Sequence, residues 1–242
     1  MIIAIDGPSG AGKSTLGKML AKELGLFYLD TGAMYRAAGL AVLKAGANLD
    51  DKEKIVEITK NSVIKFEASP LEQSQRIFLN GSDVTDEIRS SEVSHAASVI
   101  STIPEVRRIL VERQREIGKS AEKGCVLDGR DIGSVVFPDA DFKFFLTAKP
   151  ETRAQRRYEE NLKRGDKTTY EQTLHEIKER DLRDSSRLDS PLKVAEGSIT
   201  LDTSEMNLEE VFQEMLRIIR SKLNQTDFAS AKEDNSKASV NS

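Results

Sequence analysis

The chain has 242 residues, a length that suits one sizeable core with small insertions. Hydrophobic residues make up 38% and charged residues 31%, with a formal net charge of -4, which excludes wholesale disorder and a general nucleic-acid surface. The single cysteine, Cys125, excludes an intramolecular disulfide. The N-terminus carries no charged leader, and no apolar run approaches the roughly eighteen residues of a membrane span. We therefore expect a cytoplasmic protein without membrane or nucleic-acid partners.

An apolar run at residues 2–5 predicts the first buried strand, and Leu16, Leu20 and Leu24 at helical spacing predict the helix that follows. The segment between them matches GxxxxGK[ST] without a mismatch. Its glycines let backbone N–H groups converge on phosphate oxygens, Lys13 can reach the β- and γ-phosphates, and Ser14 can bind Mg²⁺. We expect a nucleoside triphosphate to bind at Gly7, Pro8, Ser9, Gly10, Ala11, Gly12, Lys13, Ser14 and Thr15.

A second apolar run at residues 27–29 leads into Asp30, Thr31 and, one helical turn later, Arg36. These side chains put a carboxylate, a hydroxyl and a guanidinium beside the expected phosphate-binding loop. A guanidinium can bind a phosphate through two hydrogen bonds, so the segment is a candidate acceptor site. The structural alternative is that Asp30 or Thr31 caps the next helix while Arg36 lies on its solvated face.

The next strand of the core is predicted at residues 125–127, too far from the second for one crossover, so the chain must contain an insertion. Residues 63–66 and 76–79 predict antiparallel strands, and Asn80-Gly81 supplies a turn before Val84-Thr85. We predict a small β-rich insert at about residues 61–92.

The third core strand ends in Asp128, Gly129, Arg130 and Asp131. Asp128 can assist Mg²⁺ through a water molecule, Arg130 can bind a phosphate, and Asp131 can accept a hydrogen bond from an amino group. The structural alternative is a salt-bridged turn. Cys125, inside this strand, is expected to be a buried and inert thiol.

A fourth core strand is predicted at residues 142–146, and two arginine-rich helical patterns follow it. Thr168 and Glu171 have the spacing of a capping box, so residues 163–166 are expected to form the bend of a helical lid at about residues 150–190. Arginines delivered by such a lid stabilise the charge on a phosphoryl group in transfer. A solvated, salt-bridged hairpin explains the pattern equally well. The charged residues in question are Arg153, Arg156, Arg157, Arg164, Arg180, Asp184 and Arg187.

The last strand is predicted at residues 198–201, and an apolar stripe over residues 208–219 predicts a final helix capped by Asn207 and Glu210. The alternation of strands and helices indicates an α/β layered fold whose ligands gather at the carboxyl ends of a central parallel sheet. We place one domain at residues 1–224 and expect a disordered tail at 225–242. His95 and His175 have no partners at metal-binding or catalytic spacing and are expected to be ordinary surface or packing residues.

Four segments of the chain, GPSGAGKST, LDTGAMYR, DGRDIGSVVFPDA and IKERDLRDSSR, closely resemble those of bacterial cytidylate kinases, in this order and over about residues 1–222. The resemblance implies a P-loop kinase three-layer fold with a nucleoside-monophosphate-binding insert and a mobile helical lid. It also implies an enzyme of pyrimidine metabolism that transfers the γ-phosphoryl group of ATP to CMP or dCMP. We expect this enzyme to depend on Mg²⁺ and to be a monomer.

The resemblance also assigns residues to the acceptor. Ser98, Arg107 and Asp131 form the edge complementary to cytosine, Arg180 and Asp184 hold the sugar, and Arg36, Arg130 and Arg187 hold the phosphate, with Thr31 as a further contact. The residues expected to act in catalysis are Lys13, Arg130, Arg157 and Arg187. Two other functions remain open: another small-molecule P-loop kinase, and a non-catalytic nucleotide-binding switch.

Overall fold

The computed structural model describes residues 1–68, 75–187 and 189–238, and its core is a five-stranded sheet in the order β2-β6-β1-β7-β8. Every neighbouring pair in this sheet is parallel. The predicted core strands and the α/β fold are therefore confirmed. The strands are β1 (Ile2–Asp6), β2 (Phe27–Asp30), β6 (Cys125–Gly129), β7 (Phe142–Thr147) and β8 (Ile199–Asp202).

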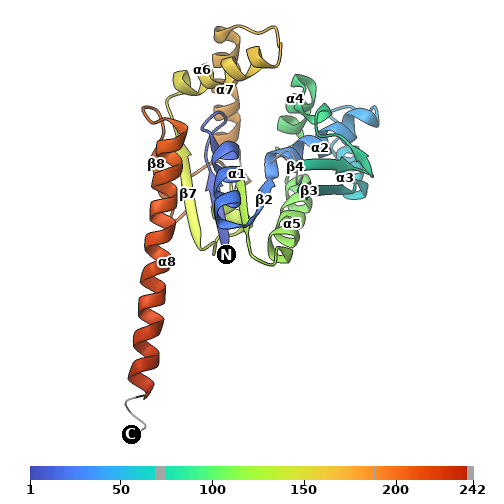
Figure 1. Cartoon of the computed structure of the whole chain (residues 1–242). Helices are drawn as coiled ribbons and strands as arrows, with labels where there is room; N and C mark the ends of the chain where they lie inside the picture. The colour runs from blue at the N-terminus through green and yellow to red at the C-terminus, as the bar shows by residue number, and fades with distance from the viewer. Residues whose placement is uncertain (69–74, 188, 239–242) are drawn as a thin grey trace.

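Helices cover both faces of this sheet, which gives three layers (Figure 1). Because side chains alternate along a strand, Ile3 and Ile5 pack on one face of the sheet and Ala4 on the other. The first face is covered by α1 (Lys13–Leu24) and α8 (Leu208–Ala238), and the second by α2 (Thr31–Lys44) and α5 (Pro104–Ser120). Both faces are thus apolar, as a buried parallel sheet requires.

The insert lies beside α2 and contains a second, antiparallel sheet in the order β3-β4-β5 (Figure 1). Asn80 and Gly81 form its turn, with φ of 50° and 85°. The third strand is Ser82–Asp83 and not Val84-Thr85, because pairing resumes directly after this two-residue turn, at Ser82 opposite Leu79. Residues 69–74 of the predicted insert lie outside the described residues. The elements here are α3 (Lys52–Asn61), β3 (Ile64–Ala68), β4 (Gln75–Leu79), β5 (Ser82–Asp83), η1 (Glu87–Arg89) and α4 (Ser91–Ile100).

Helices α6 (Pro150–Lys163) and α7 (Tyr170–Ser186) form the predicted lid and lie at the top of Figure 1. The bend between them contains Gly165 with φ of 81°. The predicted capping box was wrong by one residue. The hydroxyl of Thr169 accepts from the Gln172 amide at 3.2 Å, and the Gln172 side chain accepts from the Thr169 amide at 3.0 Å. The cap moves because α7 starts one residue later than the pattern suggested. Residue 188 lies outside the described part of the lid.

Helix α8 begins as predicted, since the side chains of Asn207 and Glu210 accept from each other's backbone amides at 3.0 and 2.8 Å. Its end lies beyond the boundary predicted at residue 224, and the disorder predicted for residues 225–242 stays a prediction. The backbone remains helical through Ala238, into the expected disordered tail (Figure 1). Residues 225–238 contain no proline or glycine, so no local signal stops the helix. No helix in the described ranges combines the length and apolar character needed to cross a membrane.

Removal of all residues after Leu223 is expected to leave both kcat/KM and Tm unchanged. In the part of α8 whose side chains are described, the stripe of fully buried side chains ends at Ile219, and the Leu223 side chain is 40% exposed. The truncation also keeps the Lys222 Nζ contact with the Asp141 carbonyl, at 2.7 Å. Paired steady-state kinetics and calorimetry test this, and a large drop in either quantity would show that the distal helix supports the core.

Candidate active site

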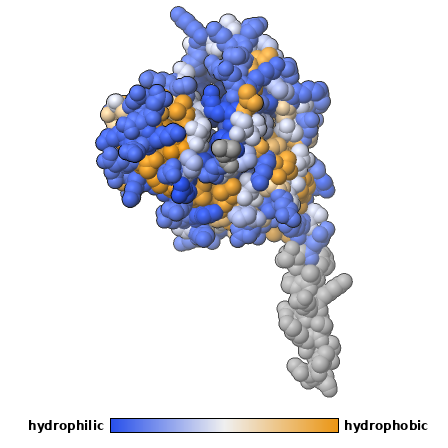
Figure 2. Space-filling view, turned by 180° about the vertical axis from the view of Figure 1, so that it is seen from behind, coloured by the Kyte–Doolittle hydropathy of each residue, from blue (hydrophilic) through white to orange (hydrophobic). Residues whose placement is uncertain are grey.

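The carboxyl ends of β1, β2 and β6 border a cavity of about 360 Å³ between the phosphate-binding loop, the insert and the lid. Figure 2 shows hydrophilic residues around the hollow below the lid. Every predicted substrate-binding residue lines this cavity: Thr31, Arg36, Ser98, Arg107, Arg130, Asp131, Arg180, Asp184 and Arg187. Lys13 and Arg157 line it as well, with Ser9, Gly10, Gly12, Ser14 and Thr15. Gly7, Pro8 and Ala11 belong to the same loop but lie outside the lining.

The phosphate-binding loop, residues 7–14, connects β1 to α1 and depends on glycine for its path. A Cβ on Gly7 would lie 2.0 Å from the Leu146 carbonyl oxygen, and φ of Gly7 is 144°. Lys13 opens α1, and its Nζ donates to the carbonyl of Pro8 at 2.7 Å. Burial and the nearby Arg130 guanidinium lower the Lys13 pKa well below its ordinary value. The charged ammonium is thus disfavoured in the free protein, and an anion in the loop would stabilise it.

Asp128, at the end of β6, lies beside this loop. It accepts hydrogen bonds from the hydroxyls of Ser14 at 2.7 Å and Tyr28 at 2.9 Å. Burial, and secondarily the charge of Asp30, raises the Asp128 pKa to about 6. The site offers oxygen ligands and a carboxylate whose negative charge is not balanced by its neighbours, which suits a hard divalent cation. Within the described residues, no group of three or more His, Cys, Asp or Glu side chains can hold a metal ion.

The start of α2 contains both a helix cap and residues that border the cavity, the two interpretations that the sequence left open. Asp30 is a structural residue: its carboxylate caps α2 by accepting from the Ala33 amide at 2.7 Å and pairs with Arg36 at 3.1 Å. Thr31 donates its hydroxyl proton to the Asp128 carbonyl at 2.6 Å, which ties α2 to the end of β6. Arg36 lines the cavity beside these groups.

Three arginines surround the Asp184 carboxylate in the cavity. Arg130 Nε donates to Asp184 at 2.9 Å, and Arg187 Nη2 lies 3.6 Å from its second oxygen. Burial and then Arg130 lower the Arg180 pKa to about 10. One carboxylate does not balance three cations, and Arg187 Nη2 is a buried donor without a hydrogen-bond partner. The cluster therefore favours a phosphate ligand.

Arg107 and Asp131 form a buried ion pair through Arg107 Nη2, between α5 and the end of β6. Arg107 Nη1 also donates to the Ser101 carbonyl at 3.3 Å, and Arg107 Nε has no partner although it is buried. Ser98 lies in the same wall of the cavity. Together these groups present a carboxylate acceptor beside guanidinium and hydroxyl groups, a pattern that suits a base with an amino donor next to ring acceptors.

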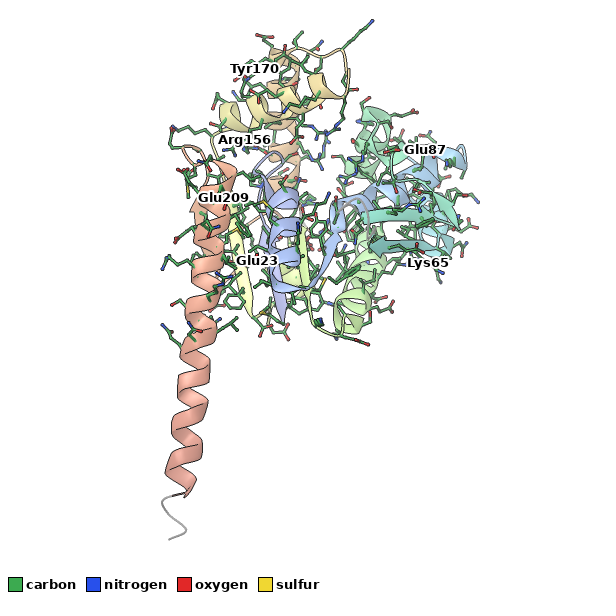
Figure 3. All side chains as sticks on the ribbon, in the orientation of Figure 1. Glu23, Lys65, Glu87, Arg156, Tyr170 and Glu209 are labelled. Carbon is green, nitrogen blue, oxygen red and sulfur yellow. The ribbon has the colours of Figure 1, made fainter. Side chains whose placement is uncertain are left out.

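Two lid arginines follow the structural alternative. Arg153 is buried and donates to the carbonyls of Ser9 at 3.1 Å and Ala148 at 2.8 Å, and to both oxygens of Asp181 at 3.0 and 2.6 Å. It therefore links the loop to both lid helices. Arg156 lies on the side of α6 next to the start of α8 and donates to the Thr203 carbonyl at 2.6 Å (Figure 3).

Asp6 is a positioning residue that the sequence interpretation missed. Its carboxylate accepts from the amides of Ile132 at 2.8 Å and Gly133 at 2.7 Å, at the start of η2 (Ile132–Val136). These bonds fix the chain directly after Asp131. An acid at the end of a predicted strand was the available signal.

For Asp6→Asn, we compare the free energy of unfolding with that of the parental protein at two pH values. The difference, variant minus parent, is expected to be about 1 kcal/mol more favourable to the variant at pH 8 than at pH 5. Burial raises the Asp6 pKa to about 6 from 3.8. A carboxyl whose folded pKa is raised stabilises the fold fully below the unfolded pKa, and that contribution is lost as pH rises through about 6. Asparagine does not titrate. Urea denaturation of both proteins at the two pH values tests this, and a difference independent of pH contradicts it.

Comparisons with known proteins show which family the chain is similar to. A family model described as cytidylate kinase matches residues 3–221. A cytidylate kinase of Caldanaerobacter subterraneus subsp. tengcongensis is 53% identical over 218 residues, which cover 90% of this chain and 94% of the relative. That of Caldicellulosiruptor saccharolyticus is 49% identical, covering 89% and 94%. That of Geobacillus sp. is 45% identical, covering 91% and 97%.

Proposed function

Because the chain belongs to the cytidylate kinase family, we propose that its cavity holds ATP at the P-loop and CMP or dCMP between α4, β6 and α7. The enzyme transfers the γ-phosphoryl group of ATP to CMP or dCMP and releases ADP with CDP or dCDP. One observation carries the residue assignment: a single cavity is lined by the P-loop, the Arg107–Asp131 pair and the arginines around Asp184.

ATP binds with its triphosphate along residues 7–15 at the N-terminus of α1, where backbone amides and Lys13 contact the β- and γ-phosphates. Ser14, and Asp128 through a water molecule, would hold Mg²⁺, which supplies charge neutralisation at the phosphate oxygens when bound. Asp128 must be ionised for this role; burial raises its pKa to about 6, so a proton competes with the cation below that pH.

The acceptor nucleotide is held at three points. Asp131 accepts from the exocyclic amino group of cytosine, while Arg107 and Ser98 donate to the ring acceptors. Asp184 and Arg180 contact the sugar. Arg36, Arg130 and Arg187 bind the acceptor phosphate; the buried Nη2 of Arg187, which has no hydrogen-bond partner and lies 3.6 Å from Asp184, supports this.

Catalysis in this proposal is positioning and charge stabilisation. The acceptor phosphate is already an anion at neutral pH, so no general base is needed, and in-line geometry comes from the opposed binding sites. Lys13, Arg130, Arg187 and the lid residue Arg157 surround the place where charge spreads over the moving phosphoryl group. Closure of the lid excludes water and thereby favours transfer over hydrolysis.

A coupled assay with ATP and CMP, dCMP, UMP or AMP tests the proposal. ADP release dependent on CMP and dCMP is expected, with a requirement for Mg²⁺ that EDTA abolishes. A different small-molecule kinase would release ADP with UMP or AMP, or only with an acceptor outside this panel. A nucleotide-binding switch would hydrolyse ATP slowly whether or not CMP is present.

The proposal includes a monomeric enzyme in the cytoplasm. The single cysteine, Cys125, is a buried thiol, and burial raises its pKa to about 12, as suits an inert thiol in a reducing compartment. Light scattering of the eluted protein tests the mass, and cell fractionation tests the location.

A further inference from the structure

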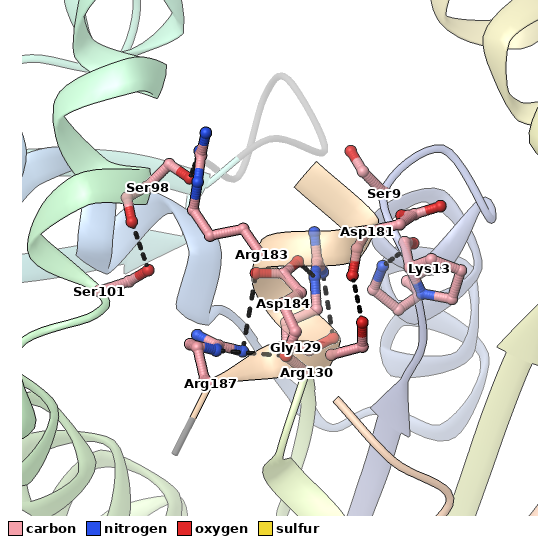
Figure 4. Close-up of polar contacts among 12 residues, drawn as sticks. Ser9, Lys13, Ser98, Ser101, Gly129, Arg130, Asp181, Arg183, Asp184 and Arg187 are labelled. Carbon is pink, nitrogen blue, oxygen red and sulfur yellow. Dashed lines mark hydrogen bonds and ion pairs between the residues drawn. The ribbon is translucent and has the colours of Figure 1, made fainter. Parts of the chain in front are cut away.

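One side chain of the lid contacts the opposite wall of the cavity without lining the cavity itself. Arg183 lies on α7, and its Nη1 donates to Oγ of Ser98 on α4 at 2.6 Å (Figure 4). Ser98 lines the cavity beside Arg107 and Asp131, whereas Arg183 is not among the lining residues. Arg183 therefore touches a group assigned to the base but leaves the base-binding space open.

This contact constrains the Ser98 hydroxyl chemically. A guanidinium has donors only, so the serine oxygen must be the acceptor, and its own proton remains available for donation. A hydrogen bond received from a cation polarises the hydroxyl, which becomes a stronger donor and a weaker acceptor. Cytosine has an acceptor at ring N3, whereas uracil carries a proton there. A hydroxyl biased toward donation therefore favours cytosine over uracil.

Both ends of the contact are held in place by the surrounding structure. Beside Arg183, the Asp184 carboxylate accepts from Arg130 Nε at 2.9 Å, which anchors this turn of α7 to the end of β6. Around Ser98, helix α4 packs tightly on α2: a Cβ on Gly39 would lie 2.8 Å from the Ala97 amide nitrogen. The Ser101 hydroxyl is engaged with the Ser98 carbonyl at 2.8 Å (Figure 4).

We propose that Arg183 is a positioning residue for base selection, which sets the Ser98 hydroxyl as a donor toward N3 of cytosine and thereby disfavours UMP. The inference rests on the proposed function, in which Ser98, Arg107 and Asp131 bind the base. It adds a residue outside the cavity to the set that determines which nucleotide is accepted.

The experiment measures kcat/KM for CMP and UMP in Arg183→Met, Ser98→Ala and the double variant. Methionine keeps the length of the side chain but removes its donors. Arg183→Met is expected to narrow the CMP to UMP ratio by about ten-fold, the usual value of one hydrogen bond, mainly through KM for CMP. Ser98→Ala should narrow it similarly, and the double variant no further. Arg183→Lys, which retains a donor, should restore most of the ratio.

Lys178→Met is the matched control, because Lys178 lies on the same helix in an exposed ion pair with Glu151 and does not line the cavity. It should leave the ratio unchanged. If Arg183→Met does not fold, Arg183→Gln replaces it, since an amide permits both roles of the hydroxyl and should also narrow the ratio.

Two results overturn the inference while leaving the proposed function intact. In the first, Arg183→Met lowers kcat/KM for CMP and for UMP by the same factor, which would show that Arg183 has only a structural role. In the second, the double variant narrows the ratio beyond either single variant, so that Arg183 acts independently of Ser98. A parental protein that shows no preference for CMP over UMP contradicts the proposed function instead.

Discussion

Replacement of Lys13 by alanine is expected to lower kcat with ATP and CMP by at least about 10² to 10³-fold while the fold is retained. Lys13 is the P-loop cation at the N-terminus of α1, and its Nζ already lies in the loop, 2.7 Å from the Pro8 carbonyl. Its ammonium neutralises charge that moves toward the β-γ bridge during transfer. Burial lowers the Lys13 pKa, which means that its positive charge is unfavourable in the protein without a bound anion. Replacement by alanine removes this charge, so we expect the nucleotide-free protein to remain folded.

Lys22→Ala is the matched control for this prediction. Lys22 lies on the same helix, in its last turn, but is exposed and away from the cavity lining. Its replacement should leave kcat near the parental value. Tm and kcat of both variants are measured together, and near-parental turnover in a folded Lys13→Ala protein would falsify the assigned role.

Substitution Asp131→Asn is expected to reduce activity with CMP sharply and to narrow the ratio of kcat/KM for CMP over UMP. The Asp131 carboxylate can accept from the amino group of cytosine, whereas uracil turns a carbonyl oxygen toward it. Sites built on such hydrogen bonds discriminate by factors of roughly 10⁴. An amide can rotate to offer a donor or an acceptor, so asparagine tolerates both bases.

The structure adds a stability effect to this variant. Asp131 pairs with Arg107 in a buried site, and loss of one partner from such a pair costs about 3–5 kcal/mol. Asparagine retains one acceptor for Arg107, so the loss should be smaller than for alanine. The ratio of the two nucleotides separates base selection from a general loss of folded enzyme, because a folding defect lowers both rates alike.

Arg130→Ala is the comparison variant. As a phosphate ligand and the partner of Asp184 at 2.9 Å, Arg130 should support both nucleotides equally, so its loss lowers both kcat/KM values and leaves the ratio nearly unchanged. If Asp131→Asn also depresses both substrates equally, Asp131 is structural or catalytic. Base selection would then reside with Ser98 and Arg107.

The strands, the P-loop and the strand–helix alternation that indicates an α/β layered fold could be predicted from the sequence because their signals are local. The apolar run ending at Ile5 and the glycines at 7, 10 and 12 specify a strand, a turn and a helix start within one short segment. The errors arose where neighbouring residues offer nearly equal caps or strands, as at Thr168 and Thr169 or at Ser82 and Val84.

The pairing of charges was decided only by the tertiary structure. Helical spacing did not distinguish Arg153, Arg156, Arg180 and Arg187 as candidate phosphate ligands. In the folded chain, Arg153 and Arg156 donate to backbone carbonyls, whereas Arg180 and Arg187 line the cavity. Arg107–Asp131, Arg130–Asp184 and Arg183–Ser98 join residues that are 24, 54 and 85 positions apart. The spacing of residues along one helix predicts which side chains share a face. The hydrogen-bond acceptor of each side chain lies on the element packed opposite, and that element is brought there only by folding.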